Sequence, residues 1–133
     1  MFQIQCLQSF QNSATEHYCK YSIGPFIKGQ GTTVGNALRR VLLSNIQGIA
    51  IIGVRITGID HEFSTVSNIK EDAVDILLNL KQIVLKGNIT EPTLARLNVK
   101  EAGVIVANAI SLPDEISLVD SRQYIATLTD KCN

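Results

Sequence analysis

The segment from Val34 to Ile46 constrains the fold most strongly, because its apolar side chains recur with the period of a helix. The spacing i, i+3, i+4, i+7 and i+8 places five of them on one face: Val34, Ala37, Leu38, Val41 and Leu42. Thr32 or Thr33 is expected to cap the start of this helix, and Gly48 to stop it. The pattern therefore predicts an amphipathic helix over this segment.

A second face of the same helix also carries apolar side chains, because Leu43 and Ile46 fall away from the main stripe, near Arg39. Arg39 and Arg40 point in directions about 100° apart. One interpretation is a pair of solvated arginines. The other is a subunit contact, since arginine is favoured in interface cores and lysine is not. We expect partners on two faces of the helix.

The glycines before the helix raise the alternative of a phosphate site. Their spacing is Gly29-x-Gly31-x-x-x-Gly35, which is one residue too long for a dinucleotide fingerprint, and no Lys-Ser/Thr pair follows. The other interpretation is a glycine-rich turn that leads into the helix, with Gly35 allowing another backbone to come close. A small enzyme that binds a phosphorylated ligand remains the rival hypothesis.

Composition narrows the classes of function further. Twelve basic and twelve acidic residues cancel, and Trp is absent, so binding of nucleic acid by this chain alone is disfavoured. Cys6, Cys19 and Cys132 form no C-x-x-C pair, which indicates free thiols rather than a zinc or redox motif. No signal peptide, transit peptide or membrane-spanning run is evident.

The rest of the chain predicts an α+β domain with mostly antiparallel strands. Strands are expected over 2–7, 17–27 and 49–59, and a second helix over 71–81 with Asn68 and Glu71 as a capping box. Gly87-Asn88 marks a turn. Four further strand-like runs follow it: LARLNVK, GVIVANAI, EISLV and YIATLT.

No catalytic cluster is apparent. Asp60-His61-Glu62 groups acids with a histidine, but it lacks the second histidine of a metalloprotease motif and is expected to be a polar loop. The acids Glu71, Asp72 and Asp75 are typical of a helix start, and nothing resembles the clustered aspartates of a two-metal polymerase centre. We therefore expect no catalytic site in this chain.

Two long motifs carry a family resemblance: GQGTTVGNALRRVLLSN at 29–45 and GVRITGIDHEFSTVSNIKEDAVDILLNLKQIVL at 53–85. They resemble the N-terminal domain of the RNA polymerase alpha subunit, of the plastid and cyanobacterial type, from Phe2 to about Thr129. The resemblance implies two incomplete parts. Residues 1–47 would form the first part of a dimerisation subdomain, and residues 48–133 the first part of a mostly β insert subdomain.

The resemblance also implies a function, which is non-catalytic assembly of DNA-dependent RNA polymerase. Val34, Leu38, Val41 and Leu42 would contact a second alpha subunit, and Arg40, with Arg39 alongside, would contact the beta subunit. The insert, with its stretch His61 to Thr65 and its helix 71–81, would also pack against beta or beta-prime. No cofactor is expected in this chain, because the catalytic magnesium of the family lies in beta-prime.

Departures from the family pattern limit these expectations. Ile27-Lys28 stands where the family has Glu-Arg, and the chain ends inside the insert, which suggests a fragment. We therefore expect no direct DNA binding by this fragment, and native dimerisation is an open question. The lack of a transit peptide and the Ile- and Asn-rich composition favour a plastid, chloroplast or cyanelle, with a cyanobacterial cytoplasm as the alternative.

Overall fold

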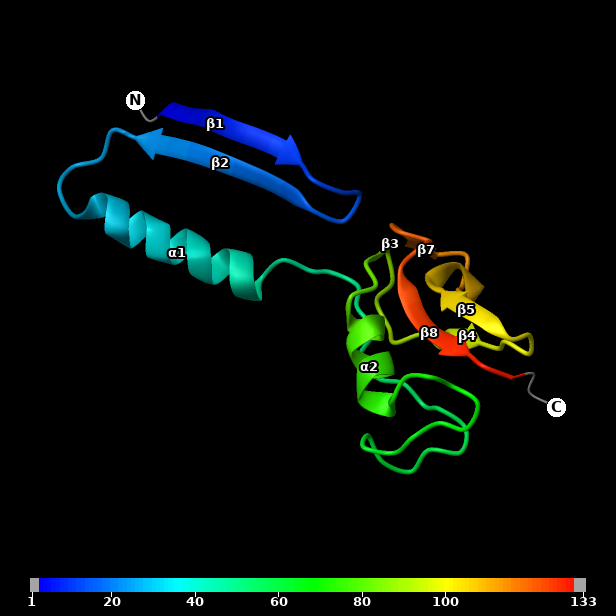
Figure 1. Cartoon of the computed structure of the whole chain (residues 1–133). Coiled ribbons are helices and arrows are strands. Elements are labelled where there is room, and N and C mark those ends of the chain that lie inside the picture. Colours follow the sequence, from blue (N-terminus) through cyan, green and yellow to red (C-terminus); the bar gives the residue numbers. More distant parts are fainter. Residues whose placement is uncertain (1–2, 131–133) are drawn as a thin grey trace. The chain divides into compact units, whose positions relative to one another are not determined.

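The computed structural model describes residues 3–130 and divides into two compact units, residues 1–48 and residues 49–133. We call them the N-terminal unit and the C-terminal unit. Figure 1 shows a hairpin and a helix in the first, and a helix with several short strands in the second. All the strand pairs among the described residues are antiparallel, and together with the two helices they confirm the predicted α+β class.

The N-terminal unit begins with a hairpin of β1 (Gln3–Gln11) and β2 (His17–Gly24). The register runs from the pair Gln3↔Gly24 to the pair Gln11↔His17, and a bulge interrupts it between Cys6 and Gln8. β1 extends beyond the predicted strand 2–7, whose first residue lies outside the described part of the chain. β2 ends before the expected position 27, because Pro25 follows it and has no backbone N–H to donate to a strand partner.

Helix α1 (Gln30–Ser44) follows as predicted, but both of its expected ends are wrong. Gly29 is the N-cap, in the left-handed conformation with φ 91°, so Thr32 and Thr33 lie inside the helix. Glycine adopts this conformation without steric cost, which lets the turn lead directly into the helix. The helix ends before Gly48, at Asn45, whose backbone N–H donates to the Val41 carbonyl at 2.9 Å.

None of the described residues of the N-terminal unit is buried. The buried apolar residues all belong to the C-terminal unit: Ala73, Ile76, Leu80, Ile83, Ile105, Ala107, Ile125, Ala126 and Leu128. Burial of apolar surface is the main favourable term in folding. The N-terminal unit therefore lacks a core of its own within residues 3–48.

The predicted strand over 49–59 is wrong, because the segment forms no strand and pairs with none among the described residues. Ile51 and Ile56 pack against the core of the C-terminal unit, whereas Ile52 is 87% exposed. Gly58 turns the chain with φ 81°. The apolar character of this segment reflects one-sided packing rather than a place in a sheet.

Helix α2 (Ala73–Lys81) begins two residues later than the predicted helix 71–81, with Asp72 at its N-cap. The expected capping box of Asn68 and Glu71 is wrong. Asn68 takes φ 64°, and its carbonyl accepts a hydrogen bond from the Thr129 N–H at 2.8 Å. The α2 residues Ala73, Ile76 and Leu80 face the core, as the helical period predicts.

Six short strands complete the described part of the C-terminal unit; all but the first fall at the four predicted runs, and the first was not predicted. They are β3 (Leu85–Gly87), β4 (Arg96–Leu97), β5 (Gly103–Val106), β6 (Ile110–Ser111), β7 (Ile116–Leu118) and β8 (Tyr124–Leu128), with a 3-10 turn at Ala107–Ala109. The pairs are β3 with β7, β4 with β6, and β5 with β8. Gly87 ends β3 rather than forming a turn, and a β-carbon there would collide with the Glu115 carbonyl oxygen on the chain beside it.

Candidate functional site

Helix α1 presents its main apolar stripe to solvent. Val34 is 37% exposed, Leu38 44%, Val41 49% and Leu42 60%. Complete burial of a fully exposed side chain of this size contributes about 1.5–3 kcal/mol, so covering these partly exposed ones contributes a fraction of that. A row of four such side chains is therefore a candidate protein-binding face, which we call the apolar face of α1. These are the four residues predicted to contact a second subunit.

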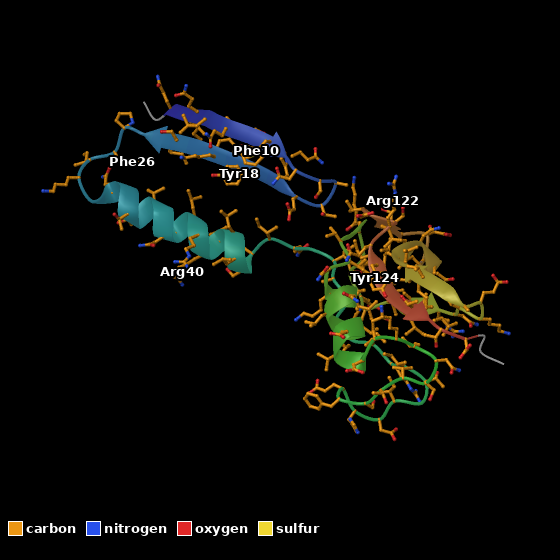
Figure 2. The ribbon with its side chains drawn as sticks, viewed as in Figure 1. Phe10, Tyr18, Phe26, Arg40, Arg122 and Tyr124 are labelled. Atoms are coloured by element: carbon orange, nitrogen blue, oxygen red, sulfur yellow. The ribbon has the colours of Figure 1, made fainter. Side chains whose placement is uncertain are left out.

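The opposite side of α1 carries Arg39, Arg40 and Leu43, which we call the arginine face. Leu43 follows Arg39 by four positions and Arg40 by three, so all three side chains share one helix surface. Leu43 is 77% exposed, and both arginines are exposed. Figure 2 shows Arg40 projecting from α1 on the side away from the hairpin. The structure thus gives the helix two open faces, as its sequence pattern predicts.

Of the three glycines in the near-fingerprint, Gly29 is the N-cap of α1, and Gly31 and Gly35 lie inside the helix. A shallow hollow of about 320 Å³ lies at the start of the helix, lined by Phe26, Gln30, Thr33 and Val34. No charged side chain lines it, and a methyl group at Gly31 would lie 3.7 Å from the Phe26 ring. The space beside Gly35 is open to at least 4 Å. The geometry therefore gives no support to the phosphorylated-ligand hypothesis.

The hairpin exposes two further groups of side chains. Phe10 and Tyr18 stack at a centroid distance of 4.7 Å near the turn (Figure 2), and they are 48% and 47% exposed. On the other face, the pKa of Tyr21 is raised by its hydrogen bond with Cys19 and by the nearby charges of the Cys19 and Cys6 thiolates. Both thiols are free and exposed, and Cys132 lies outside the described residues.

The Asp60-His61-Glu62 sequence forms a polar loop, as predicted. The His61 carbonyl accepts hydrogen bonds from the backbone N–H of Ser64 at 3.2 Å and from its hydroxyl at 2.7 Å. The three side chains border a shallow hollow of about 230 Å³ together with apolar residues such as Ile56 and Leu77. No Ser, Thr or Cys side chain lines this hollow. The neighbouring Phe63 is 78% exposed.

One cluster lies outside the sequence predictions, which assign Glu71 only to a helix start. Its carboxylate accepts hydrogen bonds from the Tyr124 hydroxyl and, at 2.7 Å, from the Thr127 N–H. Burial raises the pKa of the Glu71 carboxyl, but the Tyr124 and Thr127 hydrogen bonds outweigh that effect and hold the pKa below its ordinary value. The same hydrogen bond from Tyr124 to Glu71 raises the pKa of Tyr124.

This cluster is structural, because it joins the segment before α2 to strand β8. The Lys70 N–H donates to the Thr127 carbonyl at 3.0 Å, and Ile69 forms a bridge with Leu128. The contacts are 50 or more residues apart in sequence, as the separation of 53 between Glu71 and Tyr124 illustrates. No local sequence signal could have predicted them.

Residues 3–130 contain no group of three His, Cys, Asp or Glu side chains placed to hold a metal ion. None of their helices has the length and apolar character needed to cross a membrane.

Curated relatives match almost the whole chain. The DNA-directed RNA polymerase subunit alpha of Emiliania huxleyi is 57% identical over 130 residues, which is 98% of this chain and 42% of the relative. The subunit alpha of Guillardia theta is 50% identical over 127 residues, 96% of this chain and 40% of the relative. The subunit alpha of Synechocystis sp. is 45% identical over 129 residues, which is 97% of this chain and 41% of the relative. The chain therefore spans about two fifths of the length of these relatives.

The sources of these relatives indicate a plastid or cyanobacterial origin for the chain. A profile of the RNA polymerase Rpb3/RpoA insert domain matches residues 54–133, a range that contains α2 and every strand of the C-terminal unit. Because the match covers more than half of the sequence, the chain belongs to the family of the RNA polymerase Rpb3/RpoA insert domain.

Proposed function

We propose that the chain is a non-catalytic assembly part of a DNA-dependent RNA polymerase. In this proposal it pairs with a second alpha subunit and provides a platform for the beta and beta-prime subunits. One observation carries it: α1 exposes two distinct faces and buries no residue, in a chain 57% identical to an RNA polymerase alpha subunit. A helix with no core contact of its own requires partners to be stable, because isolated helices of this length are marginal in water.

The proposal assigns each face of α1 to one partner. The apolar face, Val34, Leu38, Val41 and Leu42, contacts a second copy of the chain, since a self-complementary apolar patch suits a two-fold dimer. Arg40, with Arg39 alongside, contacts the beta subunit. On this basis residues 1–47 form the first part of a dimerisation subdomain and residues 48–133 the first part of an insert subdomain.

The proposal also places the chemistry elsewhere in the complex. The chain supplies no catalytic residue and binds no cofactor, and the catalytic magnesium is held by beta-prime. It contacts protein rather than DNA, and the complex works in a plastid, with a cyanobacterial cytoplasm as the alternative. The relatives from algae and from cyanobacteria support this assignment of origin.

Co-purification with a beta subunit tests the assignment of the arginine face. The chain and beta are expressed together, beta is captured, and the amount of chain retained is measured. Arg40→Ala is expected to reduce retention strongly, whereas Lys20→Ala, which removes one exposed cation from β2, is the matched control and is expected to leave retention unchanged. Equal retention of the wild-type chain and the Arg40 variant would remove Arg40 from the proposed role.

Analytical ultracentrifugation tests the assignment of the apolar face. The chain is expected to sediment as a dimer, and Leu38→Glu is expected to shift it to monomer, because a buried unpaired carboxylate is costly. Lys28→Glu introduces the same acidic side chain at an exposed position before the helix and serves as the control. A dimer that survives Leu38→Glu would show that the apolar face is not the interface.

A further inference from the structure

The bulge in β1 brings two thiols to one face of the hairpin. Cys6 pairs with Tyr21 and Ser9 pairs with Cys19, and the register shifts between Cys6 and Gln8. Side chains alternate along a regular strand, so positions 6 and 9 would otherwise point to opposite faces. The extra residue of the bulge removes that alternation, and paired residues project on the same side. We call the resulting surface the thiol face, which consists of Cys6, Ser9, His17, Cys19 and Tyr21.

Three polar side chains of the thiol face surround the sulfur atom of Cys19. The Ser9 Oγ lies 3.5 Å from the Cys19 Sγ, and the His17 Nε2 lies 3.7 Å from it. The Ser9 Oγ and the His17 Nε2 are themselves 3.4 Å apart, so the three atoms form a closed triangle. The Tyr21 hydroxyl also hydrogen-bonds Cys19. Hydroxyl groups and an imidazole can all donate, so a thiolate at Cys19 can accept three hydrogen bonds.

Cys6 has the opposite hydrogen bonding, although it lies on the same face. Its thiol donates to the backbone carbonyl of Gln8 at 3.5 Å, and that bond is lost when the proton leaves. Both Cys6 and Cys19 are free and exposed, so access from solvent does not distinguish them. The hydrogen bonds around Cys19 remain possible in its thiolate, and the thiolate is the form of cysteine that acts as a nucleophile.

We infer that Cys19 is a modification site, which reacts with low-molecular-weight disulfides by thiol–disulfide exchange in preference to Cys6. The inference goes beyond the proposed function and does not depend on it, because the thiol face belongs to the hairpin and not to α1. The site is a group of side chains from both strands, with a base and two hydroxyl groups around one nucleophile.

The exchange needs no oxidant other than the disulfide itself. The His17 imidazole, 3.7 Å from the sulfur, accepts the proton of the Cys19 thiol and later returns it to solvent. The thiolate attacks one sulfur atom of the disulfide, forms a new S–S bond with it and releases the other half as a thiolate. The released thiolate takes up a proton from solvent. Cys19 is thereby oxidised, and the small disulfide is reduced.

A metal ion fits the thiol face less well. His17 and Cys19 supply one nitrogen and one sulfur ligand, whereas zinc sites in proteins use three or four protein ligands. Among residues 3–130, no third His, Cys, Asp or Glu side chain is placed to complete such a set. The arrangement therefore favours covalent chemistry at the sulfur over metal binding.

Modification by oxidised glutathione tests the inference on the folded full chain. A Cys132→Ser background leaves Cys6 and Cys19 to be compared within one molecule, and peptide mass spectrometry measures the rate of adduct formation at each. We expect Cys19 to react roughly fivefold faster or more. In concentrated urea, where the hairpin is unfolded, we expect the two rates to agree within about twofold.

Two variants test the surroundings of Cys19, with the Cys6 rate as the internal control. Ser9→Ala and His17→Ala are each expected to slow the reaction of Cys19 about threefold or more and to leave the Cys6 rate unchanged. His17→Gln keeps an N–H donor and should recover part of the loss. Lys20→Ala changes an exposed side chain on the opposite face of the hairpin and should alter neither rate.

Every outcome decides for or against the inference. Equal rates in the folded chain, or a faster reaction at Cys6, would overturn it. A preference for Cys19 that persists unchanged in urea, or that survives both Ser9→Ala and His17→Ala, would show an ordinary exposed thiol and would also overturn it. If one variant disrupts the hairpin, which a changed Cys6 rate would reveal, the other variant and the comparison in the unsubstituted hairpin still decide.

Discussion

The Glu71 carboxylate, just before α2, accepts a hydrogen bond from the hydroxyl of Tyr124 on β8, 53 residues farther along the chain. The same carboxylate accepts the Thr127 N–H at 2.7 Å, so one side chain holds two points of the strand. A third hydrogen bond comes from α2, where the Asn79 side-chain amide donates to the Ile125 carbonyl at 2.8 Å. These contacts connect α2 and the loop before it to strand β8.

Replacing Glu71 with glutamine should therefore destabilise the chain. Hydrogen bonds to a charged acceptor contribute about 1.5–3 kcal/mol, and glutamine keeps the shape of the side chain but loses the charge. We expect Glu71→Gln to lower the free energy of unfolding by about 1–3 kcal/mol, measured by urea denaturation. Glu62→Gln makes the same change at an exposed loop position and should cost less than about 0.5 kcal/mol. Equal midpoints for both variants would contradict the role of Glu71.

The pH dependence of stability should reveal the same carboxylate. Its pKa is lowered on folding, so its stabilising contribution is present above the unfolded-state pKa and is lost as pH falls through the lower folded-state pKa. The difference in unfolding free energy between the wild type and Glu71→Gln should therefore be full at pH 7 and shrink in acid. Denaturation curves recorded from neutral to acidic pH measure it. A difference that stays constant over that range would exclude Glu71 as its source.

Ionisation of Tyr124 should lower the stability of the chain at alkaline pH. Its pKa is raised on folding by the hydrogen bond to Glu71, so its contribution is present below the unfolded-state pKa and is lost as pH rises through the higher folded-state pKa. Tyr124→Phe should remove this alkaline loss while leaving the ring packed. Tyr21, whose pKa is also raised, titrates in the same region, so Tyr21→Phe is the control. An alkaline loss of stability that persists in Tyr124→Phe would count against this assignment.

Local patterns in the sequence predicted the elements but not their ends. The repeat of apolar residues from Val34 to Leu42 was sufficient to predict α1, because a helix is specified by contacts within a few residues. The cap depends on backbone conformation instead: Gly29 takes φ 91° and starts the helix before either threonine. Residue preferences cannot decide between several plausible caps that lie next to one another.

Local sequence patterns could not predict which segments far apart in the sequence contact one another. Segment 49–59 has the composition of a strand, yet none of the described residues pairs with it, so only its packing side is defined. Glu71 has the position of a helix-start charge, but its partners lie on β8. The candidate site, in contrast, could be predicted from local sequence. The two faces of α1 depend only on helical spacing, so the sequence alone predicted both.

Gly87 provides a test of close packing between β3 and β7. A β-carbon at this position would collide with the Glu115 carbonyl and would also lie 3.2 Å from the Ile116 Cα. Backbone atoms cannot move aside as a flexible side chain can. We therefore expect Gly87→Ala to lower the free energy of unfolding by about 1–3 kcal/mol. Gly53→Ala is the control, because nothing lies within 4 Å of a β-carbon there. Similar thermal midpoints for the two variants would contradict the collision.

Substitutions at Leu43 and at Ile125 should have opposite relative effects on stability and on binding to beta. Ile125 is 1% exposed in the core of the C-terminal unit, so Ile125→Ala should lower the free energy of unfolding by about 2–5 kcal/mol. Leu43 is 77% exposed, so Leu43→Ala should change the same quantity by less than about 0.5 kcal/mol. Under the proposed function the order reverses for assembly, because Leu43 lies between the two arginines of the arginine face. Denaturation and co-purification with beta are measured on both variants. If Leu43→Ala loses stability to the extent that Ile125→Ala does, then Leu43 is a core residue and the arginine face is not a binding surface.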